Sequence, residues 1–101
     1  MSAPEKRIVM AKVLAERWLR EHASPEYRLT AYCAGDEITR VAGMLRAFRN
    51  GKMRLASVSL DGNLGMNVGF DHVTVWGSSR KMLAGLDKWF LDRGHETTGV
   101  W

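Results

Sequence analysis

The chain has 101 residues, a length that fits one domain and is too short for two. Hydrophobic residues make up 46% of the chain and charged residues 26%, proportions typical of a globular protein, so the composition excludes a disordered chain. The formal net charge is +4, and Cys33 is the single cysteine. No internal disulfide can form, and nothing indicates an oxidising compartment.

The N-terminal stretch MSAPEKRIVMAK has no long apolar run, and no segment of the chain approaches the roughly 18 apolar residues of a membrane-spanning helix. We therefore expect neither a signal peptide nor contact with a membrane. The expected location is the cytoplasm.

The first predicted element is a helix over residues 5–22, where apolar residues recur at helical spacing. Val9 and Val13 lie on the outer side of this helix, so that side is either covered by another element or contacts a partner. Pro25 ends the helix, because the residue before a proline is forced out of the α region. Residues 27–34 then alternate between two faces, which predicts a strand.

A second helix is predicted over residues 36–50, with Asp36 as its candidate N-cap and Gly51 as its stop. The alternation that follows predicts one strand over residues 53–60 and another over residues 64–70, with a tight turn between them.

Two glycines, Gly65 and Gly69, leave one face of the 64–70 strand nearly bare. Such a face suits the close approach of a packing element or of a ligand, and we expect packing. A short strand is predicted over residues 73–76 and a last helix over residues 79–93, followed by a polar tail.

These elements predict a single α+β domain with the order α-β-α-β-β-β-α. We expect a mostly antiparallel sheet with the helices packed largely on one face, and the sheet neighbours of the first strand stay open. The tail comprises residues 95–101, and its terminal Trp101 either docks on the core or anchors a partner. The predicted core residues are Trp18, Leu45, Phe48, Val58, Val75, Leu86 and Phe90.

No catalytic, cofactor-binding or metal-binding motif is present in the sequence. Cys33 lies on the apolar face of its strand without a basic or histidine neighbour, which indicates a buried, inert thiol. Asp71 and His72 are adjacent, and adjacent residues of an extended chain point to opposite faces, so we expect no hydrogen-bonded pair. The histidines His22 and His95 and the other candidate ligands are too widely spaced for a zinc site. We expect a protein that is not an enzyme.

The charge is concentrated in one segment, because the residues between Ile38 and Leu60 include five basic side chains and no acidic one. Such a local excess favours an anionic partner more than a diffuse charge does, although a solvated surface explains it as well. The five residues are Arg40, Arg46, Arg49, Lys52 and Arg54.

A second candidate site lies at the start of the last predicted helix, where hydroxyl groups and cations occur together in the first turn. A helix N-terminus presents unpaired amide donors that favour anions, although serine is also a routine N-cap. The candidate residues are Ser78, Ser79, Arg80, Lys81 and Lys88.

The helix–three strands–helix order predicted for residues 36–94 is similar to that of the double-stranded RNA-binding domain, with Arg80-Lys81 where that family has a lysine-rich pattern. The family's KKxAK pattern is replaced here by Arg80-Lys81-Met82-Leu83-Ala84, and its Gly-Pro-x-His loop is missing. The likeness therefore rests on topology and on two residues.

Our leading hypothesis is a non-enzymatic binding module whose basic surface contacts an anionic partner, with nucleic-acid backbone as the expected partner. The alternative is a small protein-binding inhibitor or adaptor of the kind that phages and mobile elements encode, or a subunit of a homo-oligomer. An acidic protein surface suits the same cations. The candidate protein contacts are Val9, Val13, Leu91 and Trp101.

Overall fold

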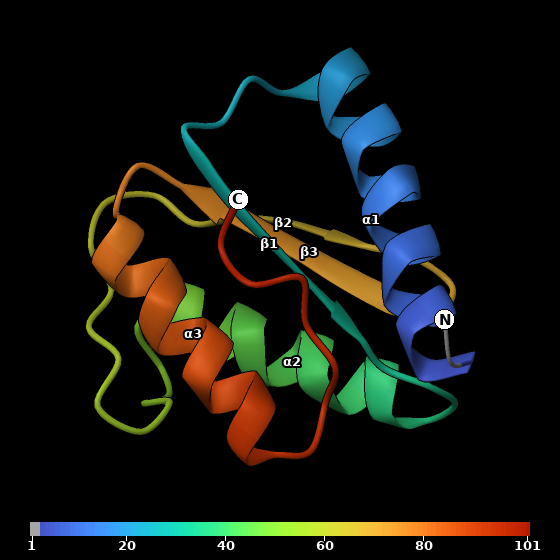
Figure 1. Cartoon of the computed structure of the whole chain (residues 1–101). Coiled ribbons are helices and arrows are strands. Elements are labelled where there is room, and N and C mark those ends of the chain that lie inside the picture. The colour runs from blue at the N-terminus through green and yellow to red at the C-terminus, as the bar shows by residue number, and fades with distance from the viewer. Residues whose placement is uncertain (1–2) are drawn as a thin grey trace.

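A three-stranded antiparallel sheet in the order β1-β3-β2 lies at the centre of the fold (Figure 1). The computed structural model describes the backbone of residues 3–101 and the side chains of residues 6–101. The strands are β1 (Tyr27–Tyr32), β2 (Gly65–Val68) and β3 (His72–Gly77). They belong to one α+β domain with the order α-β-α-β-β-α.

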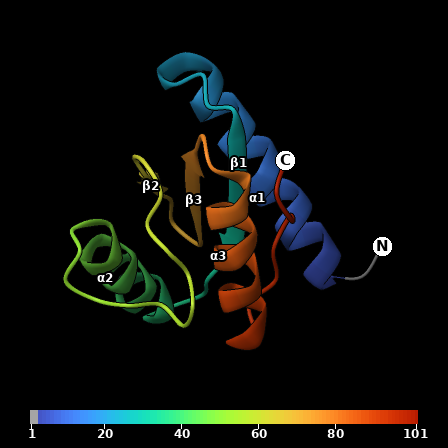
Figure 2. The ribbon, with the colours of Figure 1, turned by 90° about the vertical axis from the view of Figure 1, so that its left-hand side faces the viewer.

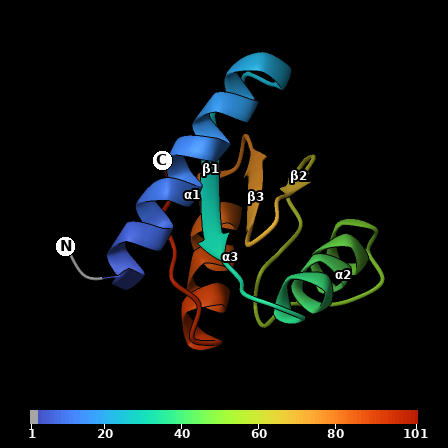
Figure 3. The ribbon, with the colours of Figure 1, turned by 90° about the vertical axis from the view of Figure 1, so that its right-hand side faces the viewer.

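Helices cover both faces of this sheet. They are α1 (Ala3–His22), α2 (Glu37–Arg49) and α3 (Arg80–Asp92). Figures 2 and 3 show α1 on one face and α2 and α3 on the other. The expectation that the helices pack largely on one face therefore holds only for α2 and α3, because α1 covers the opposite face with its small residues Ala11 and Ala15, which are buried.

The alternation in β1 separates two environments. Leu29 and Ala31 are fully buried and belong to the core on the side of α2 and α3. Thr30 points to the other face and is also fully buried. Its Oγ1 lies 3.0 Å from Oγ1 of Thr74 on β3, so the two hydroxyls satisfy each other beneath α1.

The prediction of a strand over residues 53–60 is wrong. Residues 50–64 form a loop, which we call the wrap loop, and only Leu55 of its first half is buried. The Val58 N–H donates to the Leu55 carbonyl over 3.0 Å, and Ala56 between them has a left-handed φ of 51°. The chain therefore turns here instead of extending. Without this strand, the likeness to the double-stranded RNA-binding domain in element order is lost.

Gly65 of β2 and Gly69 just after it are sites where side-chain rings of β3 approach the backbone closely. Gly65 pairs with Trp76 in the ladder, and a Cβ at Gly65 would overlap the indole ring. A Cβ at Gly69 would lie 2.6 Å from Cε1 of His72. Packing by side chains of the neighbouring strand therefore accounts for the bare face.

The C-terminal tail pairs with β1, which sequence reasoning did not predict. The Tyr32 N–H donates to the Glu96 carbonyl over 2.9 Å, and Arg28 and Trp101 exchange two backbone hydrogen bonds of 2.8 Å. The indole of Trp101 docks between cations, with the Arg28 guanidinium 4.7 Å and the Lys12 ammonium 5.0 Å from its ring centroid. The strand β1 thus has neighbours on both sides.

The predicted core is largely confirmed. Leu45, Phe48, Val75, Leu86 and Phe90 are buried. Two members, Trp18 and Val58, are only partly buried.

Two glycine substitutions test this packing. Gly65→Ala should lower the free energy of unfolding by roughly 1–3 kcal/mol, because the indole of Trp76 must leave its place against β2. Gly43→Ala is the matched control: a Cβ at this helical position meets nothing within 4 Å, so it should raise the stability by roughly 0.5–1 kcal/mol. Urea denaturation of the two variants measures both changes, and equal stabilities would contradict the packing account.

Candidate nucleic-acid interface

The end of α2 presents unpaired positive charge. Arg46 and Arg49 lie in its last turn, where cations interact favourably with the helix dipole, and Lys52 and Arg54 follow in the wrap loop. All four side chains are exposed, and none of them forms an ion pair within residues 6–101. The helix stops as predicted, with Gly51 in the left-handed conformation at φ 74°.

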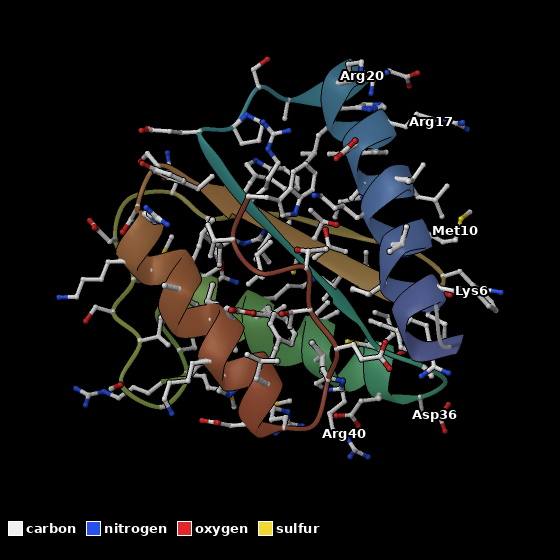
Figure 4. The ribbon with its side chains drawn as sticks, in the orientation of Figure 1. Lys6, Met10, Arg17, Arg20, Asp36 and Arg40 are labelled. Carbon is white, nitrogen blue, oxygen red and sulfur yellow. The ribbon has the colours of Figure 1, made fainter. Side chains whose placement is uncertain are left out.

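Arg40 lies apart from this group, nearer the start of α2, and it projects from the molecule in Figure 4. Its guanidinium is 3.3 Å from the carboxylate of Glu37, which is also 3.0 Å from Arg93. The hydrogen bond from Arg93, with the charge of Arg40, lowers the pKa of Glu37 below its usual value. Arg40 thus belongs to a structural ion-pair cluster. At the start of the same helix, Asp36 occupies the N-cap position without a side-chain capping bond.

The start of α3 is built as the sequence predicts. Ser79 is the N-cap, and its Oγ accepts a hydrogen bond of 3.1 Å from the Met82 N–H. Ser78, Arg80 and Lys81 are exposed. Lys88 is exposed as well, but its ammonium is 3.0 Å from the Asp92 carboxylate.

The wrap loop joins the two groups of cations. A groove of about 530 Å³ lies between its residues 56–61 and α3, with Lys81 and Lys88 in the wall. A hollow of about 390 Å³ lies on the other side of the same segment and is lined by Arg54. Figure 2 shows the loop running from the end of α2 past α3. The segment of residues 56–60 thus separates Arg54 on one side from Lys81 and Lys88 on the other.

Two contacts hold the wrap loop against α3. The Asp61 N–H donates to the thioether sulfur of Met82 over 3.3 Å. Val58 packs on Gly85, where a Cβ would lie 3.1 Å from its Cγ2 atom. A glycine in the middle of α3 thus permits the close approach of the loop.

We call the resulting area the basic surface. It carries several cations, and the carboxylates that line its groove are those of Asp61 and Asp92. Guanidinium and ammonium groups of this kind bind phosphate oxygens, and the hydroxyl of Ser78 can donate to them. The members of the basic surface are Arg46, Arg49, Lys52, Arg54, Ser78, Ser79, Arg80, Lys81 and Lys88.

The expectation that Asp71 and His72 form no hydrogen bond is wrong. Nδ1 of His72 lies 3.0 Å from Oδ1 of Asp71. Asp71 belongs to the turn before β3, so the alternation of an extended strand does not apply to it. This pair lines neither the groove nor the hollow beside the wrap loop.

The candidate protein contacts are distributed differently. Val9, Val13 and Leu91 are exposed, whereas Trp101 is docked against β1. Sequence reasoning missed Phe70, whose side chain is 95% exposed in the turn between β2 and β3. The alternation predicted for residues 64–70 places Phe70 on the apolar face of a strand. However, β2 ends at Val68, so Phe70 lies beyond the strand and is exposed.

Among residues 3–101, no helix is long and apolar enough to cross a membrane. In the same part of the chain, no three histidine, cysteine, aspartate or glutamate side chains gather in a way that would hold a metal ion.

The thiol of Cys33 provides a test of the core beside this site. It is fully buried, and desolvation raises its pKa from 9.0 to about 12. Iodoacetamide should therefore label it at pH 8 only in denaturant. The thiol of the unfolded chain ionises at a lower pH than the buried thiol of the folded chain. The contribution of Cys33 to the free energy of unfolding is therefore present below pH 9 and is lost as the pH rises towards 12. Rapid labelling of the folded protein would contradict this placement.

Comparison of the chain with protein-family models, with curated proteins and with solved structures finds no match.

Proposed function

We propose that this protein is a non-enzymatic binding module that contacts the backbone of a nucleic acid through its basic surface. The observation that carries the proposal is that the wrap loop lies between the cations of α2 and those of α3, where a groove and a hollow share one segment of the loop. Arg40 is not part of the proposed interface, because it lies near the start of α2, beside Glu37 and apart from the cations at the end of this helix.

The chemistry of the basic surface favours a duplex over a single strand. Proteins that hold single strands stack the bases on exposed aromatic rings. The exposed apolar side chains near this surface are Met53, Leu60 and Leu91, none of them aromatic, and Trp89 in the groove wall is 9% exposed. Without an aromatic platform, the cations contact phosphates, and such contacts carry no sequence information.

The same argument weighs against an acidic protein as the partner, since protein interfaces depend on exposed aromatic anchors as well as on arginine. We retain a small protein-binding inhibitor or adaptor as the alternative function. A cytoplasmic location is part of the proposal.

Fluorescence anisotropy with labelled duplex RNA, duplex DNA and single-stranded DNA tests the proposal. We expect micromolar binding to a duplex that weakens at least about tenfold between roughly 50 and 200 mM salt, because each neutralised phosphate releases a counterion. The single strand should bind more weakly at each salt concentration. An absence of binding at low salt would refute the proposal, and salt-insensitive binding would favour the alternative.

Single substitutions locate the interface. Arg54→Ala and Lys81→Ala should each weaken binding and reduce the slope of log affinity against log salt by about 1. Arg20→Ala is the matched control, because Arg20 is an exposed cation on α1, which covers the other face of the sheet. If Arg20→Ala reduced the slope as much as the other two changes, binding would depend on overall charge and not on the basic surface.

A further inference from the structure

The outer side of α1 carries an apolar surface that no element of the described chain covers. Val9, Met10, Val13 and Leu14 are between 44% and 57% exposed. Four neighbouring apolar side chains on one helix form a patch of the kind that marks a protein contact. Figure 4 shows Met10 projecting from the molecule between Lys6 and Arg17.

Charged residues flank this patch in a defined order. Side chains four residues apart are neighbours on a helix, so the outer side of α1 consists of two adjacent rows. One row carries a cation, then two apolar residues, and the other carries an apolar residue, a cation and an acid. The rows are Lys6–Met10–Leu14 and Val13–Arg17–Glu21.

We propose that α1 pairs with α1 of a second copy of this chain, antiparallel and about a two-fold axis between Val13 and Leu14. This axis places the Lys6–Met10–Leu14 row of each copy against the Val13–Arg17–Glu21 row of the other copy. Leu14 then packs on Val13, and the thioether of Met10 lies along the aliphatic stem of Arg17. Lys6 faces the carboxylate of Glu21 on the second copy, once at each end.

Charge complementarity selects this arrangement. A parallel pair would place Lys6 against Lys6 and Arg17 against Arg17, which is unfavourable. In the antiparallel pair, unlike charges meet at both ends of an apolar centre. Lys6, Arg17 and Glu21 are exposed and form no ion pair among the described side chains, so they are free to pair between copies.

The turn between β2 and β3 enlarges the contact. A stable dimer of this kind buries about 800 Å² per partner, and a helix of 20 residues, about 30 Å long, does not supply that area with one face. Phe70 supplies more. Its turn leads directly into His72, which pairs with Tyr32 at the end of the sheet where the Arg7 guanidinium of α1 lies 4.7 Å from the centroid of the Tyr32 ring. Figure 1 shows this turn on the same side as α1.

A hollow of about 670 Å³ lies at the opposite end of α1, lined by Ala23 and Ser24 together with Gly65 and Trp76. Both the hollow and Phe70 lie on the β2 side of the helix. The proposed two-fold axis exchanges the two ends of α1, so it brings Phe70 of each copy to the level of the hollow of the other. The ring and the hollow therefore form a second pair of matched features.

Sedimentation equilibrium of the purified chain, from about 1 to 300 µM, tests the proposal. We expect a reversible dimer that Leu14→Glu weakens at least about tenfold. Leu91→Glu is the matched control, because Leu91 is similarly exposed, at 52%, on α3, and it should leave the dimer constant unchanged. A wild-type chain that stays monomeric over this range, or equal effects of the two variants, would overturn the proposal.

A charge exchange tests the orientation of the helices. Lys6→Glu and Glu21→Lys should each weaken the dimer, and the double variant should restore it, because the exchanged charges face each other again. These positions are exposed, so circular dichroism should show unchanged folding. Failure of the double variant to recover would overturn the antiparallel register. None of these changes touches the basic surface, so the outcome is independent of nucleic-acid binding.

Discussion

The structure depends on the burial of β3 from both sides. This strand pairs with β1 and β2 at once. α3 and α2 contact it on one face, and on the other face the ring centroids of Trp18 on α1 and Trp76 on β3 lie 5.5 Å apart. Its residues from His72 to Val75 are all buried. A polar group in such a place must find a partner, and Thr74 does so by meeting Thr30 across the ladder. The positions of the helices, and hence of both candidate interaction surfaces, follow from this double coverage.

Features with local causes could be predicted from the sequence. The helices, the cap at Ser79, the stop at Gly51 and most core residues follow from spacing and turn chemistry. Features that depend on distant partners could not. The apolar alternation of residues 53–60 suits a strand, but the chain turns at Ala56 and Val58 packs on Gly85 of α3, so this segment does not pair with the outer edge of β2. The polar composition of the tail gives no sign of that pairing.

The candidate site, too, could be predicted from the sequence only in part. The sequence identifies the individual cations, but their grouping depends on the course of the wrap loop, whose apolar alternation predicts a strand instead. The loop lies between Arg54 and Lys81, while Arg40 stays with Glu37. The second surface, on α1, lies across the sheet from the basic surface (Figure 3). A dimer through α1 therefore leaves the cations of both basic surfaces exposed.

The most direct test of the account is an NMR titration of the ¹⁵N-labelled protein with a short duplex at low salt. Amide shift changes should concentrate in residues 46–61 and 78–88 and should reverse when salt is added, because phosphate contacts are screened. Residues of the outer side of α1 should keep their shifts. Changes centred on α1 or on the turn at Phe70, with the wrap loop unaffected, would contradict the assignment of the basic surface.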